Sequence, residues 1–197
     1  AQRYFAKYNK QKRTFEALTE LIQETADDIQ YLESISNALD IALSEADLAQ
    51  IKEELMQSGY IRRKHTKKKV KLTSKPMHYI SSDGYDMYVG KNNLQNEELT
   101  FSFANGNDWW FHAKGAPGSH VIVKSGGDEL PDRTFEEAGR LAAYYSKNRG
   151  ADKVEIDYIQ KKHVKKPNGA KPGFVVYYTN YSLIIDSDIS NIKNVQD

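Results

Sequence analysis

The segment DWWFHAKGAPGSHVIV, residues 108–123, is the part of the chain whose pattern decides the fold. It contains two runs of aromatic and β-branched residues, 109–112 and 121–123, on either side of the sequence Gly-Ala-Pro-Gly. Aromatic and β-branched residues favour strands, whereas glycine and proline together favour tight turns. The segment therefore predicts two β-strands that are joined by a tight loop.

Further strand patterns lie on both sides of this segment. Residues 79–89 alternate in polarity around a turn sequence at 82–84, which predicts a β-hairpin. Three later runs of aromatic and β-branched residues, at 154–158, 174–178 and 183–185, predict three more strands. Together these strands predict a mixed, mostly antiparallel sheet.

Two helices are predicted beside the sheet. Residues 92–104 place their apolar side chains near one helical face. Asp132 is the expected N-cap of a second helix, which has one apolar side and ends before Gly150. Helices combined with a mostly antiparallel sheet give an α+β domain.

The amino-terminal part of the chain has a different pattern. Residues 4–39 follow a heptad repeat with a mostly apolar seam, and no glycine or proline interrupts them, so they predict a long coiled-coil helix. A second helix, capped by Ser44 and ended at Gly59, is too short to cover that seam. The seam is therefore expected to meet either another copy of the chain or a missing arm of the same protein.

Composition excludes several classes of protein. The 197 residues contain no cysteine, which excludes disulfide scaffolds, thiolate zinc sites and cysteine nucleophiles. No run approaches 18 uncharged apolar residues, so no membrane-spanning helix is expected. The chain lacks an initiating methionine, and its first ten residues do not resemble a secretory signal. We expect an excised, soluble, intracellular fragment.

The formal net charge of +1 hides a strong asymmetry. Residues 1–57 have six basic and eleven acidic side chains, whereas residues 58–197 have 22 basic and 16 acidic ones. Two basic runs, at 61–82 and 158–185, contain no acidic residue. Segregated positive charge indicates either a polyanion partner or a solvated lysine-rich surface, and the sequence leaves both open.

Few residues suggest catalysis or a bound cofactor. The chain has no phosphate-loop or dinucleotide-binding motif, so no cofactor is expected. His112 and His120 follow Asp108, but their spacing matches no standard metal site, and no metal is expected. A catalytic pair such as Ser119 with His120 remains possible beside the alternative of packed or phosphate-contacting histidines.

Two loops and two tryptophans have competing interpretations. The stretch at 115–120 and the stiff basic turn at 165–173 could each bind phosphate or simply connect strands. Trp109 and Trp110 could stack on unpaired RNA bases, but at least one of them is expected in the core.

Four blocks of sequence resemble the RNA-binding domain of the NFACT family. They are GKNNLQNEELTF at 90–101, DWWFHAKGAPGSHV at 108–121, EEAGRLAAYYS at 136–146 and HVKKPNGAKPGFVVY at 163–177. Residues 4–60 look like the second arm of the family's coiled coil followed by its short helix. The resemblance covers nearly the whole chain, but only the carboxy-terminal part of a full family member.

The resemblance implies three regions. They are a coiled-coil arm with a short helix at 1–60, a basic linker at 61–76 and an NFACT-type RNA-binding domain at 77–197. The resemblance also implies a cytoplasmic factor of ribosome-associated quality control. Such a factor recognises stalled large ribosomal subunits that carry peptidyl-tRNA and supports alanine tailing of the nascent chain. Its partners would be ribosomal RNA, tRNA and the missing first coiled-coil arm.

The resemblance also implies candidate RNA-binding residues, with lysines expected on phosphates and the other side chains expected to position bases or hold loops. In the domain these are Lys91, Asn93, Asn96, Asp108, Trp109, His112, Lys114, His120, Lys165, Lys166 and Lys171. The acid-free basic run, and not the resemblance, adds the basic-linker residues Arg62, Arg63, Lys64, Lys67, Lys68 and Lys69 as candidates.

Two alternatives from other classes remain at this point. One is a surface adhesin that binds fibronectin, which an older name of the family suggests and which would place the protein at the cell surface. The other is an RNA-processing enzyme built on Asp108, His112 and His120. No catalytic constellation is established by the sequence, so we expect a binding fragment and not an enzyme.

Overall fold

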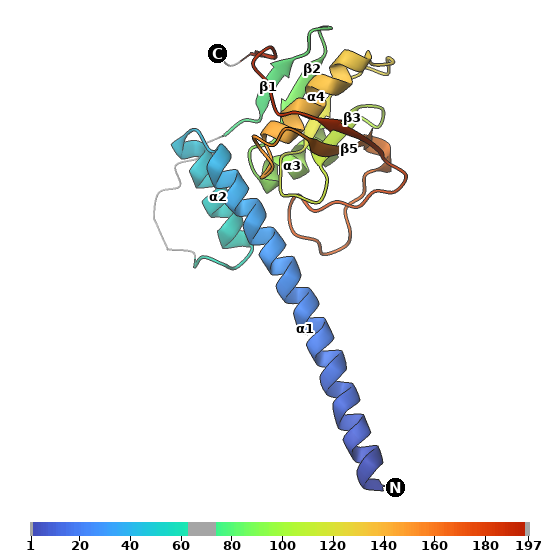
Figure 1. Cartoon of the computed structure of the whole chain (residues 1–197). Coiled ribbons are helices and arrows are strands. Elements are labelled where there is room, and N and C mark those ends of the chain that lie inside the picture. Colours follow the sequence, from blue (N-terminus) through green and yellow to red (C-terminus); the bar gives the residue numbers. More distant parts are fainter. Residues whose placement is uncertain (1, 63–73, 196–197) are drawn as a thin grey trace. The chain divides into compact units, whose positions relative to one another are not determined.

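The structure is a computed structural model that describes residues 2–62 and 74–195, and it confirms the predicted α+β fold (Figure 1). A long helix, a short helix and a sheet domain follow one another along the chain. The elements in order are α1 (Gln2–Ile41), α2 (Glu45–Gln57), β1 (Met77–Ile80), β2 (Asp86–Val89), α3 (Asn93–Glu98), the π-helix η1 (Leu99–Phe103), β3 (Trp109–Ala113), β4 (Val121–Val123), α4 (Asp132–Tyr144), β5 (Val154–Gln160), the 3₁₀-helix η2 (Lys161–His163), β6 (Tyr181–Ile185) and β7 (Lys193–Asn194).

The chain divides into two compact units, Ala1–Glu33 and Ser34–Asp197. The first unit is the amino-terminal part of α1, which confirms the predicted long helix. Its seam side chains are exposed, with 72% of Phe15 and 68% of Ile22 accessible to solvent. A single helix has no second helix within its own unit to cover such a seam, so the expectation of an outside partner stays a prediction.

The second unit is built on a seven-stranded sheet in the order β6-β5-β3-β4-β2-β1-β7. Every pairing between its strands is antiparallel. The two strands predicted from residues 108–123 are neighbours, with Trp110 opposite Ile122. The predicted hairpin is also present, with Tyr79 opposite Met87.

One face of the sheet carries the larger core. Successive strand residues point to opposite faces, so Phe111 and Val121 lie on the same side as Met87 and Ile156. Helix α4 covers this face with its buried side chains, among them Ala138, Leu141 and Ala142.

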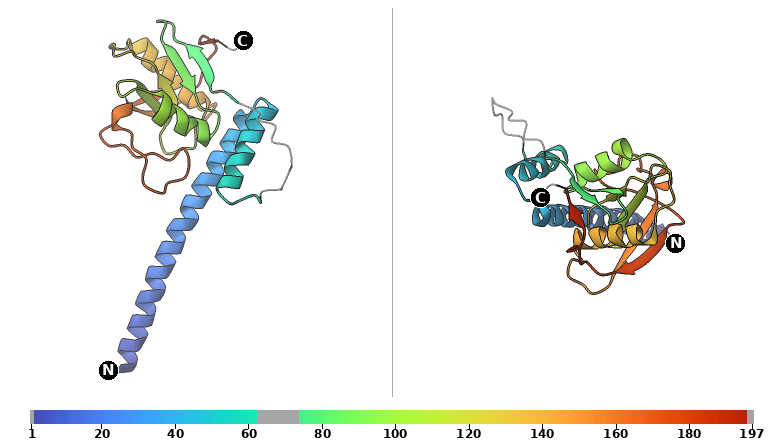
Figure 2. Two further views of the ribbon diagram at one scale, coloured as in Figure 1. Left: turned by 180° about the vertical axis from the view of Figure 1, so that it is seen from behind. Right: turned by 90° about the horizontal axis from the view of Figure 1, so that it is seen from above.

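The opposite face is covered by α3, η1 and part of the chain between β5 and β6. Trp110 and Ile122 lie on this face and pack with Leu99 of η1 and Val164 of the connection. Figure 2 shows α3 and α4 on opposite sides of the sheet. We call this second face the loop face, because the long β5–β6 connection crosses it.

Two local predictions need correction. Asp132 is the first residue of α4 and Pro131 occupies the N-cap position, where it forms no side-chain hydrogen bond. Asp132 instead adds negative charge to the first turn, which suits the helix dipole. Residues 174–178 form no strand and contribute only one isolated bridge, between Lys165 and Val176. Two members of this aromatic and β-branched run, Val175 and Tyr177, pack on the loop face outside the strand ladder.

Candidate nucleic-acid interface

The β5–β6 connection, residues 161–180, is a basic segment of the sheet domain. It contains five lysines and no acidic residue. Its start is held by main-chain bonds, with Lys161 N–H donating to the Asp108 carbonyl at 2.8 Å and Lys162 N–H donating to the Gly106 carbonyl at 3.0 Å. Lys165 and Val176 exchange two more bonds, at 2.9 and 2.8 Å, which close the segment into a loop. We call residues 161–180 the basic loop.

Aromatic side chains lie among the cations of the basic loop. The Lys161 ammonium sits 6.0 Å from the centre of the Phe101 ring. Within the loop, Phe174 is 43% exposed and Tyr178 is 75% exposed. Exposed rings next to lysines suit unpaired nucleic acid, because bases stack on the rings while the cations neutralise phosphates.

Two loop lysines have partners in the chain. Both carboxylate oxygens of Glu97 accept hydrogen bonds from the Lys166 ammonium, each at 2.7 Å. The Lys171 ammonium donates to the Tyr60 hydroxyl at 3.0 Å and lies 5.3 Å from that ring's centre. The Lys165 side chain is exposed. The predicted residues Lys165, Lys166 and Lys171 therefore share one loop.

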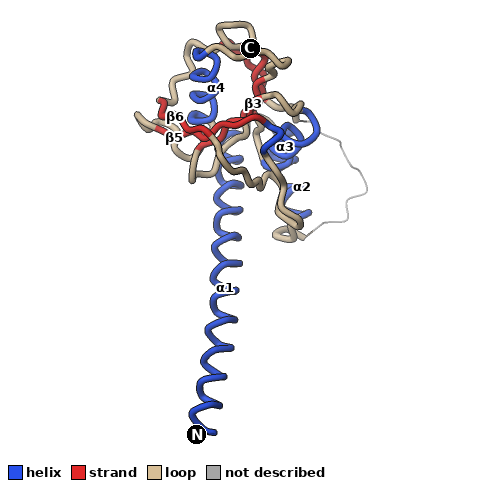
Figure 3. The backbone as a smooth tube through the Cα atoms, turned by 90° about the vertical axis from the view of Figure 1, so that its right-hand side faces the viewer, coloured by secondary structure: helices blue, strands red, loops and turns tan. Residues whose placement is uncertain are grey.

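Other predicted residues lie in a polar network between α2 and α3, which are side by side in Figure 3. The Lys91 ammonium forms an ion pair at 3.1 Å with Asp47, whose side chain is 1% exposed. Asn93 donates to Ser34 at 2.7 Å and to Glu54 at 2.8 Å. These contacts hold α3 and the residue before it against α2 and against Ser34 of α1. Contact of Lys91 and Asn93 with RNA stays a prediction.

The sequence explains why Asp47 lies at the centre of this network. Ser44 and Asp47 form the capping box of α2, which orients the aspartate toward its neighbours. Burial by itself raises the pKa of Asp47, but hydrogen bonds from Ser74, Leu43, Lys91 and Ser44 outweigh it and hold that pKa below its usual value. Asp47 is therefore a charged acceptor in the folded protein.

Asn96 and His120 lock the loop at 115–119 onto α3. The Asn96 side chain accepts a bond from His120 N–H at 3.0 Å and donates to the Gly118 carbonyl at 3.3 Å. A side chain on Gly90 would overlap Asn96, which explains the glycine there. Both residues are buried, and main-chain bonds from Ser119 to Tyr145 and from Lys147 to Pro117, each at 2.9 Å, also hold this glycine-rich loop.

The pKa values of His112 and His120 both lie below the usual value for histidine. Burial lowers the pKa of His120 well below its usual value, and the neighbouring His112 lowers it further. The Nδ1 atom of His120 lies 2.8 Å from the Thr100 hydroxyl. Burial also lowers the pKa of His112, to about 4, although it lies opposite Asp157 in the β3–β5 ladder. Both rings are neutral near pH 7, when neither can act as a cation toward phosphate.

The predicted residue Asp108 stabilises the turn before β3 by accepting hydrogen bonds. Its carboxylate accepts from the Lys124 ammonium at 2.5 Å and from the main-chain N–H groups of Asn105 and Ser125 at 2.7 and 3.2 Å. With an exposed fraction of only 1%, it is closed to a ligand unless the turn opens.

The two tryptophans point to opposite faces of the sheet. Trp110 is fully buried on the loop face, which confirms that at least one of the pair is in the core. Trp109 is half-buried on the α4 face, where it meets Phe135 edge-on at 4.8 Å. Neither ring lies in the basic loop, so their stacking on bases stays a prediction.

The remaining predicted cations are spread more widely. Lys114 is 49% exposed and pairs with Glu155 at 2.5 Å, and this hydrogen bond raises the pKa of Lys114. In the basic linker, Arg62 is exposed. The other predicted linker residues lie outside the described residues: Arg63, Lys64, Lys67, Lys68 and Lys69.

The comparisons with known proteins match both the helical part and the sheet domain. Residues 75–179 match the family model of the NFACT protein RNA binding domain. The chain belongs to the NFACT family. Residues 1–74 match the family model of the NFACT N-terminal and middle domains. The basic loop lies almost entirely within the part matched by the RNA-binding domain.

Relatives of this NFACT chain include bacterial and animal proteins. "Rqc2 homolog RqcH" of Streptococcus pneumoniae (strain D39) is 45% identical over 197 residues, and that of Bacillus subtilis (strain 168) is 40% identical. The matches cover 100% and 98% of this chain but 35% and 34% of those proteins. The chain thus spans about a third of their length. A 69-residue match, 35% identical, covers 34% of this chain and 7% of the "Ribosome quality control complex subunit NEMF homolog" of Drosophila melanogaster.

A solved structure is similar to nearly the whole NFACT chain. It is the carboxy-terminal part of the fibronectin/fibrinogen-binding protein from Streptococcus suis, at a TM-score of 0.88 and 44% identity. The match covers 96% of this chain and 75% of that one. The shared fold includes the sheet on which the basic loop is mounted.

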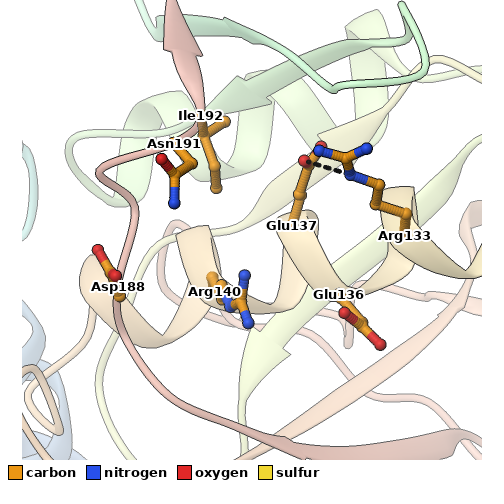
Figure 4. Close-up of a pocket in the computed structure, with 7 residues that line it drawn as sticks. All are labelled: Arg133, Glu136, Glu137, Arg140, Asp188, Asn191 and Ile192. Atoms are coloured by element: carbon orange, nitrogen blue, oxygen red, sulfur yellow. Dashed lines mark ion pairs between the residues drawn. The ribbon is translucent and has the colours of Figure 1, made fainter.

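A hollow on the outer side of α4 is a separate feature of the NFACT domain (Figure 4). Arg133 and Glu137 on its wall form an ion pair at 3.5 Å, and Arg140 pairs with Asp186 at 3.4 Å. Glu136 and Asp188 also line it, so acids and bases nearly balance there. This balance gives no preference for a polyanion, in contrast to the basic loop.

Within residues 2–62 and 74–195, no group of three or more histidine or acidic side chains is placed to hold a metal ion. No helix in the same ranges combines the length and hydropathy that a membrane crossing requires.

Sequence reasoning missed several residues near the basic loop. Lys161 and Lys162 belong to the same acid-free run, and that run is the signal that could have added them to the candidates. Glu97 had no comparable signal, because its contact with Lys166 joins residues 69 positions apart in the sequence.

Proposed function

We propose that this chain is an RNA-binding part of a ribosome-associated quality-control factor, and that the basic loop is its principal RNA contact. The observation that carries the proposal is the position of five lysines, without an acidic residue, in a loop that also exposes Phe174 and Tyr178. The match of residues 75–179 to an RNA-binding domain supports it. Lysines of the loop contact phosphates, and the exposed rings stack on unpaired bases.

The names of the relatives suggest the context in which RNA is bound. We propose that the whole protein acts in the cytoplasm and recognises stalled large ribosomal subunits that carry peptidyl-tRNA. It then supports alanine tailing of the nascent chain, with ribosomal RNA and tRNA as partners. The apolar seam of α1 pairs with a first coiled-coil arm that lies outside this sequence.

The buried candidates have an indirect part in this function. Asn93 and Lys91 hold α3 against α2, while Asn96, His120 and Asp108 fix the turns beside the sheet. We propose that they shape the surface from which the lysines reach RNA. Their substitution then changes stability first and RNA binding only through stability.

Salt dependence of binding tests the proposal. Binding of the 197-residue chain to bulk tRNA and to large-subunit ribosomal RNA is measured by filter retention at several salt concentrations. If about five cations engage phosphates, log affinity falls with log salt at a slope of roughly −3.5 to −4.5. Absence of binding, or a slope near zero, would contradict the proposal.

A fibronectin-binding surface protein is the second candidate function, because the solved Streptococcus suis relative is described as binding fibronectin and fibrinogen. The same samples are tested on immobilised fibronectin before and after ribonuclease treatment. Saturable, ribonuclease-insensitive fibronectin binding together with absent RNA binding would favour the adhesin. RNA binding with the expected salt slope would favour the ribosomal role.

RNA processing is the remaining alternative. The neutral, buried state of His120 and the closed environment of Asp108 argue for binding without chemistry. Incubation of labelled tRNA with the chain is expected to leave the RNA intact. Cleavage or modification that disappears in His112→Asn would support the enzyme instead.

A further inference from the structure

The carboxylate of Glu97 occupies the edge of the basic loop in a geometry that a phosphate could reproduce. Its two oxygens accept from the Lys166 ammonium at 2.7 Å each. One of them, Oε2, also accepts from the main-chain N–H of Gly173 at 3.2 Å. An ammonium and a loop N–H that converge on one anionic group form the kind of donor set that binds phosphate.

The Gly173 donor is held in place independently of Glu97. Gly173 has a φ of +78°, which glycine adopts without strain. A Cβ atom at this position would come within 3.0 Å of the Asn93 Cβ, so the main chain lies directly against α3. The N–H of the next residue, Phe174, donates to the Lys171 carbonyl at 3.2 Å, which closes the turn that contains Gly173. The N–H group is therefore preorganised whether or not the carboxylate remains.

The Glu97–Lys166 pair can be opened at little cost. The Lys166 side chain is 34% exposed and that of Glu97 is 31% exposed. Ion pairs with this much contact with water contribute little to stability, because solvent screens them and the long side chains lose freedom in holding them. An approaching phosphate can therefore replace the carboxylate without unfolding the loop.

We propose that the Lys166 ammonium and the Gly173 N–H form a phosphate subsite, which Glu97 fills in the free protein and from which an RNA phosphate displaces it. This inference rests on the proposed RNA-binding function and adds a regulating residue to it. Glu97 lowers the affinity of the basic loop for RNA, because its charge must leave the donors before phosphate enters. It also keeps the Lys166 ammonium close to the preorganised Gly173 N–H while RNA is absent.

The test compares two adjacent glutamates. The 197-residue chain is titrated into labelled polyuridine RNA of about 20 nucleotides, and fluorescence anisotropy reports binding. Glu97→Gln is expected to raise the affinity about three- to ten-fold, because it removes the competing charge at the donors. Glu98→Gln is the matched control, since it changes the net charge equally at an exposed neighbour and is expected to change the affinity less than two-fold.

A double substitution shows whether the effect passes through Lys166. In the Lys166→Met background, Glu97→Gln is expected to give no more gain than Glu98→Gln. Equal gains from Glu97→Gln and Glu98→Gln in the otherwise unchanged chain would overturn the subsite. A gain from Glu97→Gln that persists undiminished without Lys166 would overturn it as well.

The Gly173 amide signal in a ¹⁵N correlation spectrum provides a readout that does not depend on any variant folding. Polyuridine is expected to shift this signal at a lower concentration of phosphate groups than inorganic phosphate requires. If inorganic phosphate shifts the Gly173 signal and polyuridine does not, the subsite binds a free anion, and its role in RNA binding is overturned. If polyuridine binds but leaves the Gly173 signal unmoved, the subsite is wrong while the proposed function stands. If no RNA binds at all, the proposed function fails, and this inference fails with it.

Discussion

The segment at 90–96 and the basic loop both contain predicted RNA-binding residues, but the side chains are mostly buried in the first and mostly exposed in the second. In the first segment, Asn93 and Asn96 are 7% and 3% exposed and their amides bond to other parts of the chain. In the basic loop, the Lys165 and Lys166 side chains are accessible. Side chains of the first kind are used by the fold, whereas those of the second kind are available to a partner. A recognisable motif can therefore mark structural residues more strongly than it marks contacts.

The largest effect on stability is expected at Trp110. This side chain is fully buried on the loop face between Ile122, Ile159 and Tyr177. Trp110→Ala removes that packing and is expected to lower the free energy of unfolding by about 3–5 kcal/mol, measured by urea denaturation. Trp110→Phe is the control, since it keeps a ring in the core and should cost clearly less. Similar losses for both variants would show that the cavity is not the cause.

A loss of similar or slightly smaller size is expected from opening the buried polar network. Asp47→Ala leaves the Lys91 ammonium without its carboxylate and removes the capping box of α2. Breaking a buried pair in this way costs about 3–5 kcal/mol, whereas the exposed Glu45→Ala should cost less than about 0.5 kcal/mol. Both are compared by thermal and urea unfolding. Equal stability of the two variants would show that the Lys91–Asp47 ion pair does not stabilise the fold. The 90–96 segment would then again be a candidate for contact with RNA.

A fall in pH is expected to lower the free energy of unfolding, because His112 and His120 are buried in the neutral form. The folded-state pKa values of His112 and His120 are lowered by burial, so the unfolded chain binds more protons below pH 6.5. The histidine contribution to stability is thus complete above pH 6.5 and decreases as the pH falls from 6.5 toward 4. His120→Asn should be less stable at pH 7 by about 1–3 kcal/mol and show a flatter pH profile between 6.5 and 5. An unchanged profile in both His112→Asn and His120→Asn would contradict the burial argument.

The fold was more predictable from the sequence than the use of the individual side chains. The runs of aromatic and β-branched residues at 109–112 and at 121–123 correctly predict two neighbouring strands, because strand propensity depends on the local sequence. The same kind of run at 174–178 predicts a strand, but there Val175 and Tyr177 pack against the loop face as part of a loop. The local sequence pattern alone does not distinguish a strand that pairs within the sheet from a loop that packs on the face of the sheet.

The candidate site was only partly accessible to the same reasoning. The acid-free lysine run was visible in the sequence, and the structure places it in one exposed loop. Burial of Asn93 by Ser34 and Glu54 was not visible, because those contacts join residues 59 and 39 positions apart. Long-range hydrogen bonds leave no periodic signal, so amides with structural partners resemble amides that are free to bind.

The most direct measurement compares two triple charge reversals in RNA binding at about 0.1 M salt. The first converts Lys165, Lys166 and Lys171 of the basic loop to glutamate. The second makes the same change at Lys147, Lys153 and Lys193, which are also exposed but lie outside that loop. The basic-loop variant is expected to lose affinity for tRNA on the order of 100-fold, with a shallower salt slope and unchanged melting temperature. The control variant should lose only a few-fold, whereas equal losses from the two variants would contradict the assignment of RNA contact to the basic loop.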